Sequence, residues 1–225
     1  MPVFNERGTV EEAIGQVLDA KLPVRDFELI VVDDGSTDGT GQVLLDRSWP
    51  GDIRVLTHER NRGKGAAVRT AIAEARGKWT GIIDADLEYK PSDLSAVLEP
   101  LIAGEAEAVL GTRAFDAHTA YSFWYVMGNK FVTFVANVLY NTWISDMMTC
   151  HKAMSTELFR SLGLREEGFG IEPEIVAQLL LRGVRVREVP IAYSPRTREE
   201  GKKLDAKDGL RVLRTLVRCR VAGAR

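Results

Sequence analysis

Short apolar runs alternate with amphipathic stretches along the first half of this 225-residue chain. Four runs rich in β-branched and other apolar residues predict buried strands over 27–32, 53–57, 79–83 and 108–110. Between these runs we expect helices over 8–20, 39–47 and 91–102, and a further helix that follows the 61–65 loop and runs through Glu74 or Ala75. Strands that alternate with helices indicate a layered α/β fold with a mostly parallel sheet.

The second half of the chain has a different pattern. We expect helices over 121–140 and 171–182, and a β-alternating segment over 184–193. The stretch 121–140 is rich in aromatic residues, which fit either core packing or contact with lipid tails. No internal repeat or obvious linker interrupts the chain, so we expect a single domain over 1–225.

Polar residues gather where the predicted strands end. Asp33 and Asp34 follow the first run, Asp84 and Asp86 follow the third, and Arg113 follows the fourth. The carboxyl ends of parallel strands meet at one edge of a sheet, where α/β proteins bind their ligands. The pattern therefore predicts one crevice that contains all of these side chains.

The start of the chain fits this pattern less well. A helix that begins near Thr9 should follow a strand of its own, yet residues 2–6 read as a loop and only Met1 precedes them. We therefore expect the first strand to be missing, which would leave neighbouring backbone groups without partners.

Composition narrows the class of protein. Apolar residues make up 45% of the chain and the formal net charge is −2, which argues against nucleic acid as a partner. Cys150 and Cys219 form no CxxC motif, and the three histidines show no zinc-type spacing. No apolar run approaches the roughly 18–20 residues of a membrane-spanning helix, and no signal peptide is visible, so we expect a cytosolic location.

The charge is unevenly distributed. Residues 196–225 carry ten Lys and Arg against four Asp and Glu, a net charge of +6, which leaves −8 for the rest of the chain. Leu210, Leu213 and Leu216 recur at helical spacing with basic residues on another face. A basic amphipathic helix over 206–225 fits the interface of an anionic membrane, and an ordinary surface helix is the alternative.

Three motifs carry candidate chemistry. Asp84, Asp86 and Glu88 occupy alternate positions after a strand. This arrangement favours a site for a hard cation such as Mg²⁺ over the alternative, a solvated acidic turn. The segment 32–40 combines carboxylates with small residues that let a ligand approach, and it also offers helix caps. The segment 61–65, Asn-Arg-Gly-Lys-Gly, places cations and glycines before a helix, which suits an anion or a plain solvated loop.

Taken together and in order, these motifs resemble family-two glycosyltransferases of the GT-A fold. The motifs are 2–6, 32–38, 61–65, 84–86 and 111–113. The later segments 128–130, 146–152, 169–174 and 196–203 narrow the resemblance to polyprenol- or dolichol-phosphate mannosyl- and glucosyltransferases. The resemblance implies a nucleotide-sugar-binding half over 1–115, an acceptor-side half over 116–205 and a C-terminal helix over 206–225.

The resemblance also implies roles for single residues. Nucleotide-sugar binding falls to Pro2, Phe4, Glu6, Val32, Asp34, Lys64, Asp84 and Ala85. The metal ligands would be Asp84, Asp86 and Glu88, with Mg²⁺ or Mn²⁺ as the cofactor, although the family often has Gln at the third position. Residues at the reacting phosphates would be Asp86, Arg113, Arg196 and Lys202, and Asp146 is a candidate base.

The implied reaction moves a hexose from GDP-mannose or UDP-glucose to polyprenyl phosphate at the cytosolic face of a membrane, with inversion. A phosphomonoester is largely dianionic at pH 7 and needs no strong base. A carbohydrate hydroxyl acceptor is one alternative, and it would require a base, for which Asp146 is the candidate. A non-catalytic nucleotide-sugar-binding protein is the other, especially if the first strand is missing.

Overall fold

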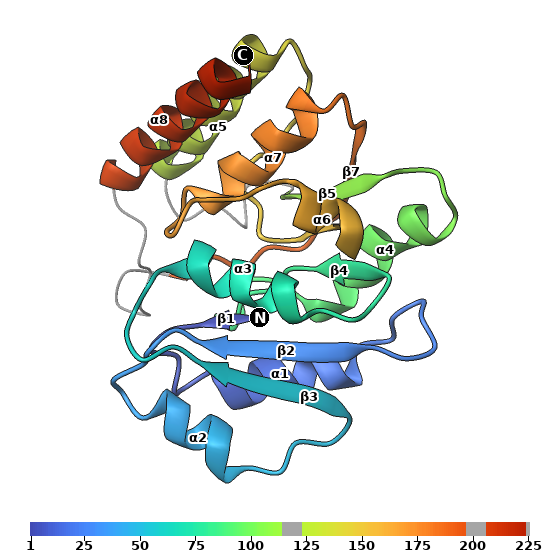
Figure 1. Ribbon diagram of the computed structural model, residues 1–225, viewed down its shortest axis with the longest axis vertical. Helices are drawn as coiled ribbons and strands as arrows, with labels where there is room; N and C mark the ends of the chain where they lie inside the picture. The colour runs from blue at the N-terminus through green and yellow to red at the C-terminus, as the bar shows by residue number, and fades with distance from the viewer. Residues whose placement is uncertain (114–122, 197–205, 224–225) are drawn as a thin grey trace.

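A computed structural model describes residues 1–113, 123–196 and 206–223 of the chain (Figure 1). One sheet contains β1 (Pro2–Val3), β2 (Glu28–Asp33) and β3 (Asp52–Thr57) in the order β1-β2-β3, all parallel. Helices α1 (Val10–Asp19) and α2 (Thr40–Asp46) connect these strands. Apolar residues of α1 pack against β2 in one core cluster, which includes Ile14, Val17 and Val31.

The first strand corrects one expectation. Pro2 and Val3 are not loop residues but a two-residue strand in register with Val32 and Asp33. The pairing extends to Met1, whose carbonyl accepts from Val32 N–H at 2.9 Å and whose amino group donates to the Ile30 carbonyl at 2.8 Å. The backbone of β2 is therefore paired along this edge, rather than left open as the sequence suggested.

The second sheet is mixed. It contains β4 (Trp79–Gly81), β5 (Ala108–Arg113), β6 (Lys152–Ser155) and β7 (Val186–Ile191), in the order β4-β6-β5-β7. Strand β6 runs antiparallel to both neighbours, and β5 runs parallel to β7. The sequence did not predict β6, which is four residues long and begins with a lysine.

Helices cover these sheets. The helix expected after the 61–65 loop is α3 (Lys64–Glu74), which begins within that segment. The helix expected over 91–102 is a 3-10 turn, η1 (Pro91–Asp93), followed by α4 (Leu94–Ile102). Two further helices, α6 (Thr156–Ser161) and α7 (Ile171–Leu181), follow β6. The largest core cluster joins α4, β5, β6 and α7, with Val97, Val109, Met154 and Ile175 among its buried members.

Two long helices form a further layer with α7. Helices α5 (Phe123–Tyr140) and α8 (Ala206–Gly223) lie side by side at the top of Figure 1. Their shared seam buries Val132, Ala136, Val212 and Leu216, and the Tyr140 hydroxyl donates to the Leu216 carbonyl at 2.8 Å. The core-packing interpretation of the aromatic stretch is wrong for Phe123, Trp124, Phe131 and Phe134, which α5 exposes.

Candidate active site

The loops after β1 and β2 are bonded to each other. Asn5 N–H donates to Ser36 Oγ at 2.9 Å, and Thr37 N–H donates to Asn5 Oδ1 at 2.8 Å. Glu6 N–H donates to Thr40 Oγ1 at 3.0 Å. Asn5 has a positive φ of 51°, a conformation that asparagine tolerates better than most residues. These bonds fix the loop that carries Phe4 and Glu6 beside the carboxyl end of β2.

Asp34 fixes a third loop. Its carboxylate accepts from Arg62 N–H at 3.0 Å and from Gly63 N–H at 2.6 Å, and its Oδ1 lies 2.6 Å from His58 Nδ1. The residue is only 2% exposed. The structure therefore gives Asp34 the task of holding the 61–65 loop, and its contact with a nucleoside stays a prediction.

Two glycines in that loop permit a close approach to the segment before α7. A Cβ added at Gly63 would lie 2.3 Å from the Glu167 carbonyl oxygen, and one added at Gly65 would lie 2.3 Å from the Glu166 carbonyl oxygen. Ala66 N–H donates to the Glu167 carbonyl at 3.1 Å. Larger side chains would push these backbones apart, so the glycines set the position of Lys64 between them.

Lys64 lies between two carboxylates. Its Nζ is 2.7 Å from Asp84 Oδ2 and 2.8 Å from Glu172 Oε1. Burial alone would lower the pKa of Lys64, but Asp84 and Glu172 raise it well above its usual value. Burial likewise opposes ionisation of Asp84, yet Lys64 brings the pKa of that carboxyl below its usual value. Both groups are therefore charged at neutral pH.

Asp86 has the opposite electrostatic environment. Burial, followed by the nearby charges of Asp84 and Glu88, raises the pKa of Asp86 to about 7. Its carboxylate accepts from Glu88 N–H at 3.0 Å. Leu87 between them has a positive φ of 60°, which is rare for such a residue and is typical of functional sites that tolerate strain.

Glu88 connects the acidic motif to the segment after β7. It accepts from the Tyr193 hydroxyl at 2.9 Å and from Arg196 N–H at 2.9 Å. Arg196 Nη1 in turn donates to Glu6 at 3.0 Å, so it joins the first loop of the chain to this end of the site. Arg196 Nη2 is buried with no hydrogen-bond partner among the described residues. That nitrogen is a donor available to an incoming anion.

Arg113 and Asp146 form a buried pair. Arg113 Nε lies 2.6 Å and Nη2 lies 2.9 Å from the two Asp146 oxygens, and Asn129 donates to the same carboxylate at 3.1 Å. The guanidinium also lies 4.8 Å from the centre of the Tyr193 ring. Although burial opposes it, Arg113 holds the pKa of Asp146 below its usual value. A carboxylate in this state is a weak base.

The structure thus brings together most of the residues predicted to form the site. Glu6, Lys64, Asp84, Asp86, Glu88 and Arg196 belong to one connected group of loops, and Arg113 touches it through Tyr193. Pro2 lies in β1, and Phe4 is half-buried in the loop that follows. The side chains of Val32 and Ala85 are buried in the core, so they serve packing. Lys202 lies outside the described residues.

Three contributing residues were missed. Glu172, Lys152 and Tyr193 contact the site but received no role from the sequence. The available signal was a charged residue inside an apolar stretch, such as Lys152 before Ala153 and Met154 or Glu172 after Ile171. Such charges are rarely buried without a partner.

The acidic motif can be tested for a metal. Within the described parts of the chain, no three His, Cys, Asp or Glu side chains are arranged to hold a metal ion. The three-ligand set of Asp84, Asp86 and Glu88 is not assembled, because Glu88 bonds with Tyr193 and Arg196. Asp84 and Asp86 still fit a divalent cation, since they are hard oxygen donors and a cation would offset the repulsion that raises the pKa of Asp86.

The order of these loops along the chain agrees with a known family. The sequence model described as Glycosyl transferase family 2 matches residues 1–163. The chain belongs to this family. Membership confirms the family predicted from the sequence.

Two relatives match most of this chain. Glycosyltransferase AglJ of Haloferax volcanii is 28% identical over 206 residues, which cover 91% of this chain and 65% of AglJ. A dolichol-phosphate mannosyltransferase of Pyrococcus furiosus is 26% identical over 208 residues, which cover 90% of this chain and 57% of that protein. The chain therefore spans less than two thirds of the length of these relatives.

Solved structures confirm the fold. Glucosyl-3-phosphoglycerate synthase of Mycobacterium tuberculosis, crystallised with Mn²⁺, UDP-glucose and phosphoglyceric acid, matches with a TM-score of 0.73 and 21% identity. The match covers 98% of this chain and 78% of that one. At this identity the likeness shows the GT-A fold alone.

Proposed function

We propose that this family 2 protein transfers a hexose, with inversion, from a nucleotide-diphosphate sugar to polyprenyl phosphate at the cytosolic face of a membrane. The single observation that carries the proposal is an exposed apolar face on α5 and α8. A lipid-linked acceptor would bring the protein to a bilayer, and this face suits that environment. The name of the Pyrococcus furiosus relative, a dolichol-phosphate mannosyltransferase, supports the same acceptor class.

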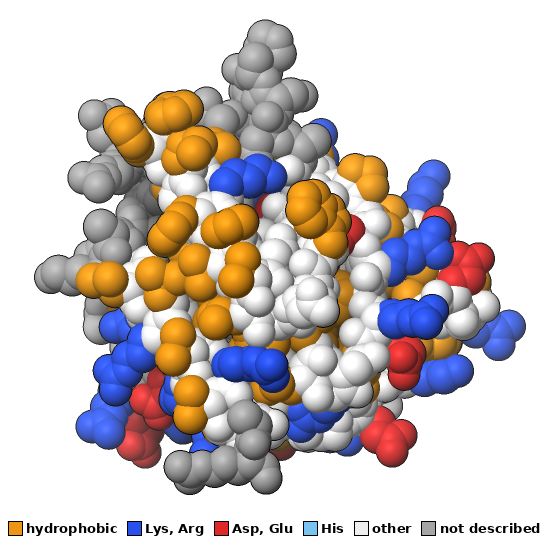
Figure 2. Space-filling view, turned by 90° about the horizontal axis from the view of Figure 1, so that it is seen from above, with side chains coloured by type: hydrophobic (Ala, Val, Ile, Leu, Met, Phe, Trp, Pro, Cys, Tyr) orange, Lys and Arg blue, Asp and Glu red, His pale blue; other side chains and the backbone are white. Residues whose placement is uncertain are grey.

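The apolar face of α5 is a single helical stripe. From Trp124 onward its exposed members recur at spacings of three and four residues, so they share one side of the helix, and Phe123 adjoins them at its start. They are Phe123, Trp124, Met127, Phe131, Phe134 and Val138, with exposures between 46% and 80%. Trp143, just after the helix, is 87% exposed. Figure 2 shows the resulting group of hydrophobic side chains on the face seen from above.

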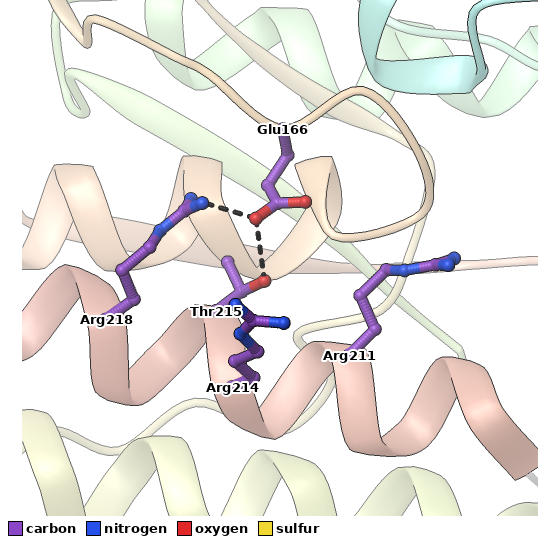
Figure 3. A pocket seen from close by; sticks show the side chains of 5 residues that line it. All are labelled: Glu166, Arg211, Arg214, Thr215 and Arg218. Atoms are coloured by element: carbon purple, nitrogen blue, oxygen red, sulfur yellow. Dashed lines mark hydrogen bonds and ion pairs between the residues drawn. The ribbon is translucent and has the colours of Figure 1, made fainter.

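Helix α8 adds a narrower stripe with basic residues beside it. Leu210, Val217 and Val221 are exposed, and the side chains of Arg211, Arg214 and Arg218 line a cavity of about 270 Å³ with Glu166 and Thr215 (Figure 3). Arg218 pairs with Glu166 at 2.9 Å and Arg211 pairs with Asp208 at 3.0 Å. Acidic partners thus offset part of this charge, so apolar contact contributes more to membrane binding than charge does. Among the described residues, no helix is both long and apolar enough to cross a bilayer.

The donor would bind at the group of loops. In this proposal Pro2, Phe4, Glu6 and Asp34 surround the nucleoside, with Val32 and Ala85 supporting them from the core. Lys64, Arg113, Arg196 and Lys202 offer positive charge to the phosphates. Asp84 and Asp86 would hold Mg²⁺ or Mn²⁺, with Glu88 fixing the loop behind them, and the metal would offset the charge of the departing diphosphate.

The chemistry needs little from a base. An oxygen of the acceptor phosphate attacks the anomeric carbon from the face opposite the leaving group. As that bond forms, the bond from the anomeric carbon to the diphosphate oxygen breaks, and the nucleoside diphosphate leaves with the electron pair. Lys64 and Arg196 stabilise the charge that develops on the diphosphate. The buried pairing of Asp146 with Arg113 disfavours a hydroxyl acceptor that would need Asp146 as its base.

A donor and acceptor screen tests the proposal. Radiolabelled GDP-mannose and UDP-glucose are each incubated with the protein, Mn²⁺ or Mg²⁺, and either polyprenyl phosphate in vesicles or soluble sugars. We expect label in the organic phase with polyprenyl phosphate and one of the donors. Label only on a soluble sugar would favour the hydroxyl-acceptor alternative, and nucleotide binding without any transfer would favour a binding protein.

A further inference from the structure

The residues behind Lys64 form a buried chain of charges. The side chain of Lys152 is 0% exposed and that of Glu172 is 3% exposed, and the two are in direct contact. Lys152 also donates to the Thr149 carbonyl. Removing charges from water is costly, and an apolar pair of similar volume is often as stable as a buried ion pair. Stability alone therefore does not account for this buried pair.

Glu172 contacts two lysines on opposite sides. One carboxylate oxygen meets Lys152, and the other lies 2.8 Å from Lys64 Nζ, which is itself 2.7 Å from Asp84. Glu172 lies in the first turn of α7, and Lys152 begins β6 in register with Leu110 of β5. Both charges are thus held by regular secondary structure, and Lys64 itself is the first residue of α3, whereas Asp84 lies in the loop after β4. Groups on rigid elements define position more accurately than groups on loops.

The two carboxylates around Lys64 differ in availability. Asp84 belongs to the acidic motif and would turn to a metal when the donor binds. Glu172 is enclosed by Lys152 and Lys64, so it keeps its contact with Lys64 in either state. We propose that Glu172 is a positioning residue that holds the Lys64 ammonium where it meets the donor diphosphate, with Lys152 as the buried counter-charge of Glu172. This inference rests on the proposed function, because it assumes that Lys64 binds a nucleotide diphosphate.

A double-mutant cycle tests the dependence on Lys64. UDP and GDP binding, each with Mn²⁺, is measured by calorimetry for the wild type, Glu172→Gln, Lys64→Met and the double variant. Glu172→Gln removes the ion pair that holds the Lys64 ammonium and Lys64→Met removes the ammonium itself, so we expect binding to weaken by about tenfold and about thirtyfold, respectively. Because Glu172 acts through Lys64, the double variant should bind no more weakly than Lys64→Met alone.

Glu174→Gln is the matched control. Glu174 lies on the same turn of α7 and is as buried as Glu172, at 2% exposure. Its partners are the N–H groups of Arg165 and Glu166 and the half-exposed Arg218, and a glutamine oxygen can still accept from the N–H groups. We expect the nucleotide affinity of Glu174→Gln to be within about twofold of the wild type.

In turnover, Glu172→Gln should raise the KM for the donor and leave the KM for polyprenyl phosphate unchanged.

The outcomes separate the two proposals. If the wild type binds neither nucleotide, the proposed function is overturned and this inference with it. If the wild type binds but Glu172→Gln binds equally well, or if its effect persists in full without Lys64, only the positioning role is overturned. Should Glu172→Gln fail to fold, Lys152→Met with Glu172→Gln removes both buried charges, and we expect this variant to fold and show the same loss of affinity.

Discussion

The loops of the site and the exposed face of α5 and α8 differ in where their side chains make contacts. In the loops, polar groups from distant parts of the sequence bond to one another, as in the contacts of Asp34 with the 61–65 loop and of Arg196 with Glu6. On α5, most of the outward side chains are apolar and face solvent, with Lys130 as an exposed charged residue among them. One region has its contacts within the chain, and the other presents apolar surface to its surroundings.

This difference separates two tasks. Bonded loops are organised before a small charged ligand arrives, so less binding energy is lost in ordering them. An exposed apolar face gains free energy only when a partner covers it. We therefore expect substitutions in the loops to change donor use and turnover, and substitutions on α5 to change membrane binding. Five predictions test this separation, from the largest effect to the smallest.

The largest effect should come from Asp86→Ala. Under the proposed function Asp86 would hold the metal beside the diphosphate, so its loss should lower kcat/KM by about a thousandfold. The fold should be retained, because the substitution removes a repelled charge. Steady-state transfer assays and thermal unfolding measure the two effects, with Asp46→Ala on α2 as an unaffected control. Wild-type turnover by the variant would remove Asp86 from the site.

Substitutions in the exposed apolar stripe of α5 should weaken membrane binding and leave nucleotide binding unchanged. Phe131→Ser combined with Phe134→Ser removes two exposed rings, each worth at least about 1.5 kcal/mol when buried, so vesicle binding should weaken by about a hundredfold. Nucleotide affinity should not change. Co-sedimentation with vesicles measures the first and calorimetry the second.

Leu45→Ser on α2 is the control for that experiment. Leu45 is 66% exposed, comparable with Phe131 and Phe134, but it lies far from α5 in the fold (Figure 1). Its loss should leave vesicle binding unchanged. Equal weakening by both variants would mean that α5 has no special part in membrane contact.

The site should titrate, whereas the apolar face should not. The folded pKa of Asp86, about 7, lies above its unfolded value, so the native state holds a proton that the unfolded state releases between pH 4 and 7. The metal-free protein should lose stability as pH rises through this range, by at most about 1.4 kcal/mol per pH unit. Urea unfolding in a chelator measures the slope, and Asp86→Asn should lack this contribution. A slope unchanged by Asp86→Asn would contradict the assignment.

Arg196→Ala should weaken donor or acceptor use by about tenfold. The substitution removes one charged donor from the site and leaves Glu6 without that pair. The loss of folding stability should be smaller than the loss in kcat/KM, because Glu6 keeps its hydrogen bond from the Thr9 hydroxyl at 2.8 Å. Kinetics with each substrate varied in turn measure the effect, and unchanged constants for both substrates would exclude Arg196 from the site.

The smallest effect should come from Arg214→Ala. A basic residue near an anionic bilayer contributes about 1 kcal/mol, so binding to anionic vesicles should weaken by about fivefold and binding to neutral vesicles should not change. Arg218→Ala should weaken binding to anionic vesicles less than Arg214→Ala does, because Glu166 and Glu174 already offset the charge of Arg218. Equal effects on both vesicle types would contradict a role for charge.

The sequence predicted much of the fold and less of the site. Strands β2, β3 and β5 and most helices were visible as apolar runs and stripes, because their periodicity is local. Strand β6 was not, since its four residues carry no clear alternation and its place depends on pairing with β4 and β5. The strand Pro2–Val3 was missed for the same reason, as a two-residue strand depends on register with β2.

Within the site, motifs indicated residue types but not their contacts. Asp84 was predicted from the acidic motif and Lys64 from the 61–65 motif and the family resemblance, yet their contact across 20 residues follows from the fold. Glu172 and Lys152 received no role, because a lone charge in an apolar segment does not identify its partner. The exposure of the α5 aromatics also depends on tertiary packing, which decides which side of a helix is covered.

The most direct test of the account is the identity of the product. The wild-type protein is incubated with polyprenyl phosphate vesicles, Mn²⁺ and the donor selected by the screen, and the organic-phase product is analysed by mass spectrometry and NMR. We predict a polyprenyl phosphate hexose whose anomeric configuration is inverted, absent when Asp86→Ala replaces the wild type. A hexose attached to a hydroxyl acceptor, or retention of the anomeric configuration, would contradict the account.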